Sequence, residues 1–128
     1  MDKTIECYIQ LTYFGTYINE EGVLRHLPNS IKEQVKNDVN FGKVIKEKIN
    51  LAEEFIVYNI LKLNEKPDTI DKAISIVMEI LCAILIIEYY IMLSPQIFGT
   101  QLEENNFFGI RGTLIGRLNS SSLYSGII

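Results

Sequence analysis

Apolar residues recur at helical intervals over residues 41–63. Counted from Phe41, they follow one another at steps of four, four, three, four, four and three residues. This spacing keeps them on one face of an α-helix of about six turns, with charged residues on the other faces. Phe55 and Tyr58 widen the apolar face, so we expect the second half of this helix to be the more buried. The stripe consists of Phe41, Ile45, Ile49, Ala52, Ile56, Ile60 and Leu63.

The segment 69–93 is apolar on nearly every side. A helix of this kind is buried among other helices, and the Ser-Pro pair that follows it marks its end. Its acids, Glu79 and Glu88, must be paired with a cation, be protonated or reach the rim of the core. We expect Arg111 or Arg117 to fold back and pair with one of them, with the rim as the alternative.

Weaker patterns precede these two helices. The aromatic-rich residues 4–17 recur at helical spacing, although their β-branched content also allows a strand. A short helix is expected over 20–27. Pro28 then marks a boundary, and the spacing of Ser30 and Glu33 predicts a capping box at the start of the next helix.

Three glycines allow two interpretations of residues 107–118. On a helix, Gly109, Gly112 and Gly116 would form a smooth face that permits close approach to a neighbour. A glycine-bearing hairpin is the alternative. With the helix, the chain is all-α, a compact bundle of about five to six helices around the central helix 69–93. The length predicts a single domain over 1–128.

The stretch 74–93 raises the question of a membrane, because it has about the length that spans a bilayer. Glu79 and Glu88 lie on nearly opposite sides of a helix, so they cannot share one polar stripe. We therefore expect the buried helix of a soluble domain, with a membrane helix as the alternative. The first residues carry no signal-peptide pattern, which predicts a cytoplasmic protein.

Charge and cysteine content narrow the class of protein. The net charge of −4 argues against nucleic acid as a partner, since nucleic-acid binders usually carry a basic excess. Cys7 and Cys82 lie in apolar runs. This position is typical of buried free thiols in a reducing compartment, which again predicts the cytoplasm.

The residues that most enzymes need are scarce. His26 is the only histidine, and we expect it at the surface or at the edge of a short helix. Apolar neighbours raise the pKa of a thiol, so neither cysteine is expected to be a nucleophile. No histidine or cysteine pair has metal-ligand spacing, and the glycines do not follow a nucleotide-binding pattern. The sequence therefore predicts no catalytic residue, no cofactor and no metal.

Three pairs of adjacent glutamates are the candidate chemistry that remains. Adjacent residues point to different sides of a helix, so no pair is an acid–base dyad by its spacing. The pairs are either solvated surface charge or an acidic surface for a basic partner, with tyrosines as anchors. The candidate partner-binding residues are Glu20, Glu21, Glu53, Glu54, Glu103, Glu104, Tyr13 and Tyr17.

In length, acidity, single-domain organisation and frequent use of Ile, Lys and Asn, the chain resembles the immunity proteins of polymorphic and contact-dependent toxin systems. The resemblance implies a cytoplasmic protein that binds a cognate toxin domain, often a basic nuclease, and covers its active site with acidic and aromatic groups. Two alternatives stay open: a viral or phage helical binder of a host protein, and a membrane-associated protein that uses 74–93. A flank of the central helix could also form the seam of a homo-oligomer.

Overall fold

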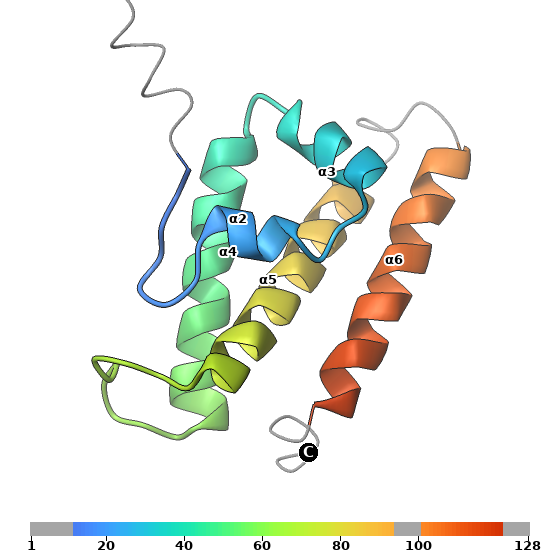
Figure 1. Cartoon of the computed structure of the whole chain (residues 1–128). Coiled ribbons are helices and arrows are strands. Elements are labelled where there is room, and N and C mark those ends of the chain that lie inside the picture. Colours follow the sequence, from blue (N-terminus) through green and yellow to red (C-terminus); the bar gives the residue numbers. More distant parts are fainter. Residues whose placement is uncertain (1–11, 94–100, 122–128) are drawn as a thin grey trace, which may run out of the picture.

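Helices make up the regular structure of the described residues, as the all-α prediction requires (Figure 1). A computed structural model describes residues 12–93 and 101–121, without the side chains of 101–106. The α-helices are α2 (Glu20–Leu24), α3 (Asn29–Lys36), α4 (Phe41–Glu54), α5 (Lys72–Leu93) and α6 (Gln101–Ser120), and the π-helix η1 (Phe55–Ile60) continues α4. The compact helical bundle is confirmed.

The apolar helix α5 lies at the centre of the bundle. It packs between α4 and α6, and α2 contacts it as well. Figure 1 shows α4, α5 and α6 side by side, with α2 and α3 across one face of this layer. Met78, Ile86 and Ile87 of α5 have no exposed surface, because neighbouring helices enclose them. The central helix is thus confirmed, although it begins at Lys72 and not at residue 69.

By length and composition, α5 is also the one helix of the described ranges that could cross a membrane. Its most apolar window has a mean hydropathy of 2.3, and 56% of that window is buried inside the protein. The core helix of a soluble protein meets the same criterion as a membrane helix. The hydropathy of α5 therefore does not decide where in the cell the protein lies, and the cytoplasmic location stays a prediction.

The helix expected over 41–63 is an α-helix for only its first part. After Glu54 the backbone widens into η1, and the Leu61 amide N–H then donates to the Ile56 carbonyl at 2.8 Å. Lys62 follows with a φ of 59°, a left-handed conformation that ends the helix. A π-helical segment of this kind is rare and marks a place where the regular ladder has been altered.

The apolar stripe is buried as predicted as far as Ile60, whereas Leu63 is exposed. The greater burial expected of the second half is wrong for two aromatic residues, because 38% of Phe55 and 41% of Tyr58 remain exposed. A π-helix has more residues per turn than an α-helix. The spacing of the stripe nevertheless holds for Ile56 and Ile60 inside η1, and it fails at Leu63, which lies beyond the end of the helix.

The residues before α2 form a tight turn and not the expected helix. In this turn the Gly15 amide donates to the Ile18 carbonyl at 2.8 Å. Residues 4–11 of the predicted helix lie outside the described residues. Helix α2 then begins after Asn19, whose side chain accepts a hydrogen bond from the Gly22 amide at 2.8 Å. This cap explains where α2 starts, and the helix ends at Leu24, three residues before the expected 27.

The capping box predicted for α3 is wrong. Pro28 occupies the N-cap, no side chain caps the helix, and Ser30 already lies inside it. Pro28 has a φ of −62°, the value its ring imposes, and its carbonyl accepts from the Lys32 amide at 2.9 Å. The rigid proline therefore sets the start of α3 without a serine cap.

Residues 107–118 are helical, so the helix is confirmed over the hairpin. The close-approach face is wrong, because a Cβ atom added at Gly109, Gly112 or Gly116 would meet nothing within 4 Å. The buried positions of α6 are instead the apolar Phe107, Leu114 and Leu118. Large side chains, and not glycines, attach α6 to the bundle; α5 is its principal neighbour.

Both acids of α5 have partners on other elements. The Arg111 guanidinium donates from Nε and Nη2 to Glu88 Oε2 at 3.0 Å and 2.9 Å, which confirms the predicted arginine pair. Arg117, the other candidate, is exposed. Glu79 Oε1 lies 3.1 Å from His26 Nε2, an interaction that the sequence pattern did not predict.

Replacing Arg111 tests the contribution of its pair with Glu88. Both side chains are 38% exposed, and exposed pairs of this kind stabilise a protein by about 0.5–1 kcal/mol. We expect Arg111→Ala to lower the melting temperature by about 2–4 °C in differential scanning calorimetry. Arg117→Ala, on the same helix, is the matched control and should leave it unchanged. Equal effects of the two substitutions would contradict the assignment.

Candidate binding surfaces

Glu53 is a fully buried charged residue, with 0% of its surface exposed. Its carboxylate accepts hydrogen bonds from three consecutive amides, those of Thr16 at 3.2 Å, Tyr17 at 2.7 Å and Ile18 at 3.0 Å. Lys66 Nζ lies 3.8 Å from Glu53 Oε1. Amide donors and a nearby cation compensate for the water that the carboxylate gives up on burial.

The turn fits around Glu53 only because residue 15 has no side chain. A Cβ atom there would lie 2.5 Å from Ile49 Cγ2 and 2.7 Å from Glu53 Oε2. The adjacent Tyr17 donates its hydroxyl hydrogen to the Pro67 carbonyl. Burial, followed by the charge of Glu53, raises the pKa of Tyr17. The carboxylate therefore ties the turn to α4, and Tyr17 ties it to the loop after η1.

These contacts remove Glu53 from the predicted partner surface, because a residue with no exposed area cannot touch another protein. Tyr17 is half-buried with its hydroxyl engaged, which makes it an internal contact of the fold. Glu54, the neighbour of Glu53, is exposed and stays available. The side chains of Glu103 and Glu104 lie outside the described residues.

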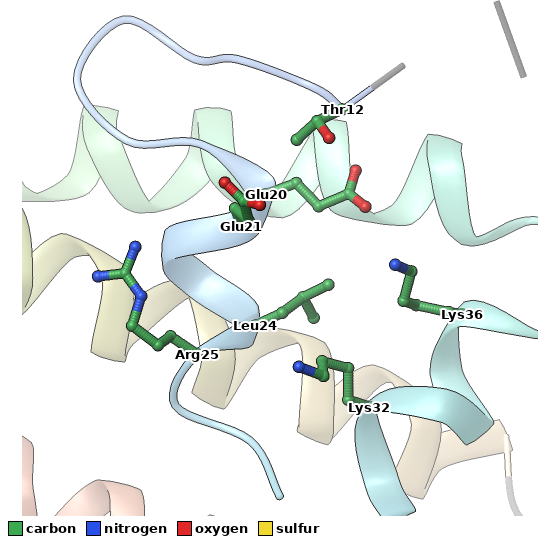
Figure 2. Close-up of a pocket in the computed structure, with 7 residues that line it drawn as sticks. All are labelled: Thr12, Glu20, Glu21, Leu24, Arg25, Lys32 and Lys36. Carbon is green, nitrogen blue, oxygen red and sulfur yellow. The ribbon is translucent and has the colours of Figure 1, made fainter. Parts of the chain in front are cut away.

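Glu20 and Glu21 line a hollow of about 380 Å³ between α2 and α3 (Figure 2). Lys32 and Lys36 line its other side, and the figure shows Leu24 between the acidic and the basic walls. Tyr13 stands beside this region: its amide donates to Glu20 Oε1 at 3.4 Å, and its hydroxyl donates to Asn50 Oδ1 at 3.3 Å. The hollow is therefore of mixed charge and not the uniformly acidic surface that the glutamate pairs suggested.

A second surface runs along the exposed side of α4 and η1. Three large side chains stay uncovered there: Leu51 is 47% exposed, Phe55 38% and Tyr58 41%. Exposed acids accompany them on the same helix. Spacings of four, three, one and three residues place all five positions along one side of the helix, as far as the π-helical segment allows. We call this set the α4 stripe; it consists of Glu47, Leu51, Glu54, Phe55 and Tyr58.

An apolar groove of about 230 Å³ lies beside the stripe, and its lining consists of Leu51 and Phe55 on one side and Leu81 and Leu85 of α5 on the other. Residues two apart on an α-helix point in nearly opposite directions. Leu81 therefore points away from Glu79, which approaches α2 at Gly22. The groove accordingly opens on the face of the α4–α5 pair that α2 does not cover.

Sequence reasoning missed this groove because it assigned Phe55 and Tyr58 to the core. Leu51 carried a usable signal, since it falls outside the apolar stripe although it is a large hydrophobic residue. An apolar residue on the polar side of an amphipathic helix is a candidate contact residue.

The described residues show where metal-ligating and nucleophilic side chains lie. No group of three or more histidines, cysteines and acids there could hold a metal ion. Cys82 is a free, buried cysteine, as expected, while Cys7 lies outside the described residues. Burial, followed by the charge of Glu53, raises the pKa of the Cys82 thiol, which keeps it protonated and unreactive.

Comparison with protein-family models, with curated proteins and with solved structures found no match for this chain.

Replacing Glu53 by glutamine tests its role in the fold. The amide would keep one oxygen but place an NH₂ group against amide donors. We expect Glu53→Gln to lower the free energy of unfolding by about 2–4 kcal/mol, measured by urea denaturation. The adjacent, exposed Glu54→Gln is the control and should change it by less than about 0.5 kcal/mol. Similar values for both variants would overturn this role.

The state of Cys82 can be measured with a thiol reagent in a Cys7→Ser background, where Cys82 is the only cysteine. Because its pKa is raised, the thiolate fraction at pH 8 is very small, and burial blocks the reagent as well. We expect no labelling by Ellman's reagent in the native protein and one equivalent after denaturation in urea. Rapid stoichiometric labelling of the native protein would contradict the buried position.

Proposed function

We propose that this chain is a small binding protein that holds a basic partner protein on the α4 stripe. The observation that carries the proposal is the exposure of Leu51, Phe55 and Tyr58 in one row, next to an apolar groove. Contiguous exposed apolar surface rimmed by polar residues is typical of protein-binding sites, since leaving it in water is unfavourable. The charge of the stripe favours a basic partner.

The apolar groove and the acids beside it would have different roles in binding. A large apolar side chain of the partner would enter between Leu51 and Leu85, with the aromatic residues around it as the energetic centre of the contact. Glu54 stands beside Leu51 on the stripe and attracts positive charge, whereas Glu47 Oε1 lies 4.0 Å from Lys48 Nζ of the same helix. Such rim charges act mainly on the rate of association and on the choice of partner.

Neutralisation of a toxic partner is the activity we propose for this binding. The resemblance to immunity proteins implies a cognate toxin domain, often basic, covered by acidic and aromatic groups. The α4 stripe supports the proposal because it combines both kinds of group, with Glu54 among the residues expected from the sequence. Glu20, Glu21 and Tyr13 belong to a separate surface by α2, which would at most extend the contact.

A tagged copy of the chain, purified from its native host, tests the proposal. We expect a stoichiometric basic protein to co-purify, to stop growth when expressed alone and to be neutralised by co-expression of this chain. Leu51→Glu should abolish both capture and neutralisation, because it places a charge in the apolar groove. Val39→Glu is the matched control: Val39 is 95% exposed and lies outside the stripe, so this variant should behave as wild type.

Three results would count against the proposal. A captured protein that is harmless when expressed alone would refute neutralisation while leaving binding in place. Recovery of this chain alone would favour a homo-oligomer, and recovery only in detergent would favour association with a membrane. If the Leu51→Glu variant formed the same complex as wild type, the contact would have to lie outside the groove. Circular dichroism should show the same melting temperature for both variants, which separates lost binding from lost folding.

A further inference from the structure

A separate groove of about 290 Å³ lies between the α2–α3 corner and α6. From the corner it is lined by Arg25, His26, Leu27 and Pro28, and from α6 by Ile110, Thr113, Leu114 and Arg117. The four α6 residues share one face of the helix, because they stand at positions i, i+3, i+4 and i+7. Segments far apart in the sequence thus build one site.

Two arginines without a partner among the described residues face this groove. Arg25 is the C-cap residue of α2, and Arg117 lies in the last turn of α6; both are exposed. Neither takes part in an ion pair within the described ranges, in contrast to Arg111, which is held by Glu88. Arg25 also lines the neighbouring hollow, where Figure 2 shows its guanidinium pointing away from the two lysines.

Neither carboxylate near the groove forms an ion pair with an arginine that lines it. Glu79, the acid of α5 on this side, already lies 3.1 Å from His26 Nε2. Glu21 precedes Arg25 by one helical turn, yet forms no ion pair with it. The two guanidinium groups therefore keep their hydrogen-bond donors available for an anion.

The remainder of the lining is part apolar and part polar. Leu27 and Leu114 are almost fully buried, so the apolar base that a ligand could touch consists mainly of Pro28 and Ile110. Thr113 already donates its hydroxyl hydrogen to the Gly109 carbonyl at 3.2 Å, so it contributes its methyl group more readily than a donor. A charged rim over an apolar base suits a molecule that carries both a charged group and an apolar part.

We propose that this groove binds a small organic anion, in which a carboxylate is attached to an apolar body. The carboxylate lies between the guanidinium groups of Arg25 and Arg117, which present planar arrays of donors that match its two oxygens. The apolar body packs on Pro28 and Ile110 and leaves water. The site is independent of the α4 stripe, which lies on other helices.

Phenylacetate is the probe for the first test, with two relatives as comparisons. Phenylacetamide has the same shape without the charge, and acetate has the charge without the ring. We expect phenylacetate alone to raise the melting temperature saturably at millimolar concentration, and to shift the backbone amide NMR signals of Ile110 and Thr113. An equal effect of phenylacetamide would overturn the role of the arginines, and an equal effect of acetate would overturn the apolar base.

Two variants test the named residues in the intact chain. Arg25→Gln and Arg117→Gln should each weaken phenylacetate binding by about tenfold, since each removes a charged hydrogen-bond donor. Lys43→Gln, which removes an exposed positive charge on α4, is the matched control and should bind as wild type. All three positions are exposed, so the melting temperature without ligand should stay the same. Unchanged affinity in both arginine variants would refute the site.

Discussion

The Glu53 carboxylate can occupy the core only because three consecutive amides of the preceding turn donate to it. Transfer of an isolated carboxylate out of water is unfavourable by many kcal/mol, and hydrogen bonds from N–H groups offset that cost. The turn must therefore keep the geometry that aims the amides of Thr16, Tyr17 and Ile18 at α4. Since α2 follows two residues later, this one side chain also sets where α2 crosses the bundle.

The position of α2 in turn decides how the central helix meets its neighbours. Gly22 of α2 stands against the Glu79 carboxylate, and His26, two residues beyond the end of α2, supplies that carboxylate with a partner. On another side of α5, Glu88 receives Arg111 from α6. An apolar helix thus carries two acids whose partners come from two separate elements. The same arrangement creates the groove between the α2–α3 corner and α6, because α2 ends at its rim.

The two faces of the α4–α5 pair differ in how far other helices cover them. Helices α2 and α3 cover one face (Figure 1). Glu53 accepts hydrogen bonds from the turn that leads to α2. The other face keeps Leu51 and Phe55 exposed over the groove to Leu81 and Leu85. The change from α4 to the π-helix η1 occurs next to this face and alters the direction of the residues that follow. Irregular helical geometry and uncovered apolar surface therefore lie next to each other at the proposed partner surface.

Hydrophobic spacing alone determined the class of this fold. The i, i+3, i+4 recurrence from Phe41 to Ile60 and the apolar run of α5 specify buried helices, because burial of apolar surface follows the helical period. The pairing of Arg111 with Glu88 also followed from the sequence, since a charge in an apolar helix demands a partner. Local patterns were weaker guides at two places. The glycines of α6 form no packing face, because large apolar side chains attach that helix. Ser30 does not cap α3, because Pro28 occupies the N-cap.

Only the tertiary structure decided which acids are exposed and which are buried. Glu53 and Glu54 are neighbours of the same type, so no local pattern separates them, yet one lies in the core and the other in solvent. The difference depends on a turn that is distant in sequence and donates its amides to a single carboxylate. Phe55 is likewise exposed because no other described segment covers it. Composition and periodicity describe the type of a residue and its local pattern. Burial depends on which segments, distant in the sequence, pack against that residue, and this is a property of the folded chain.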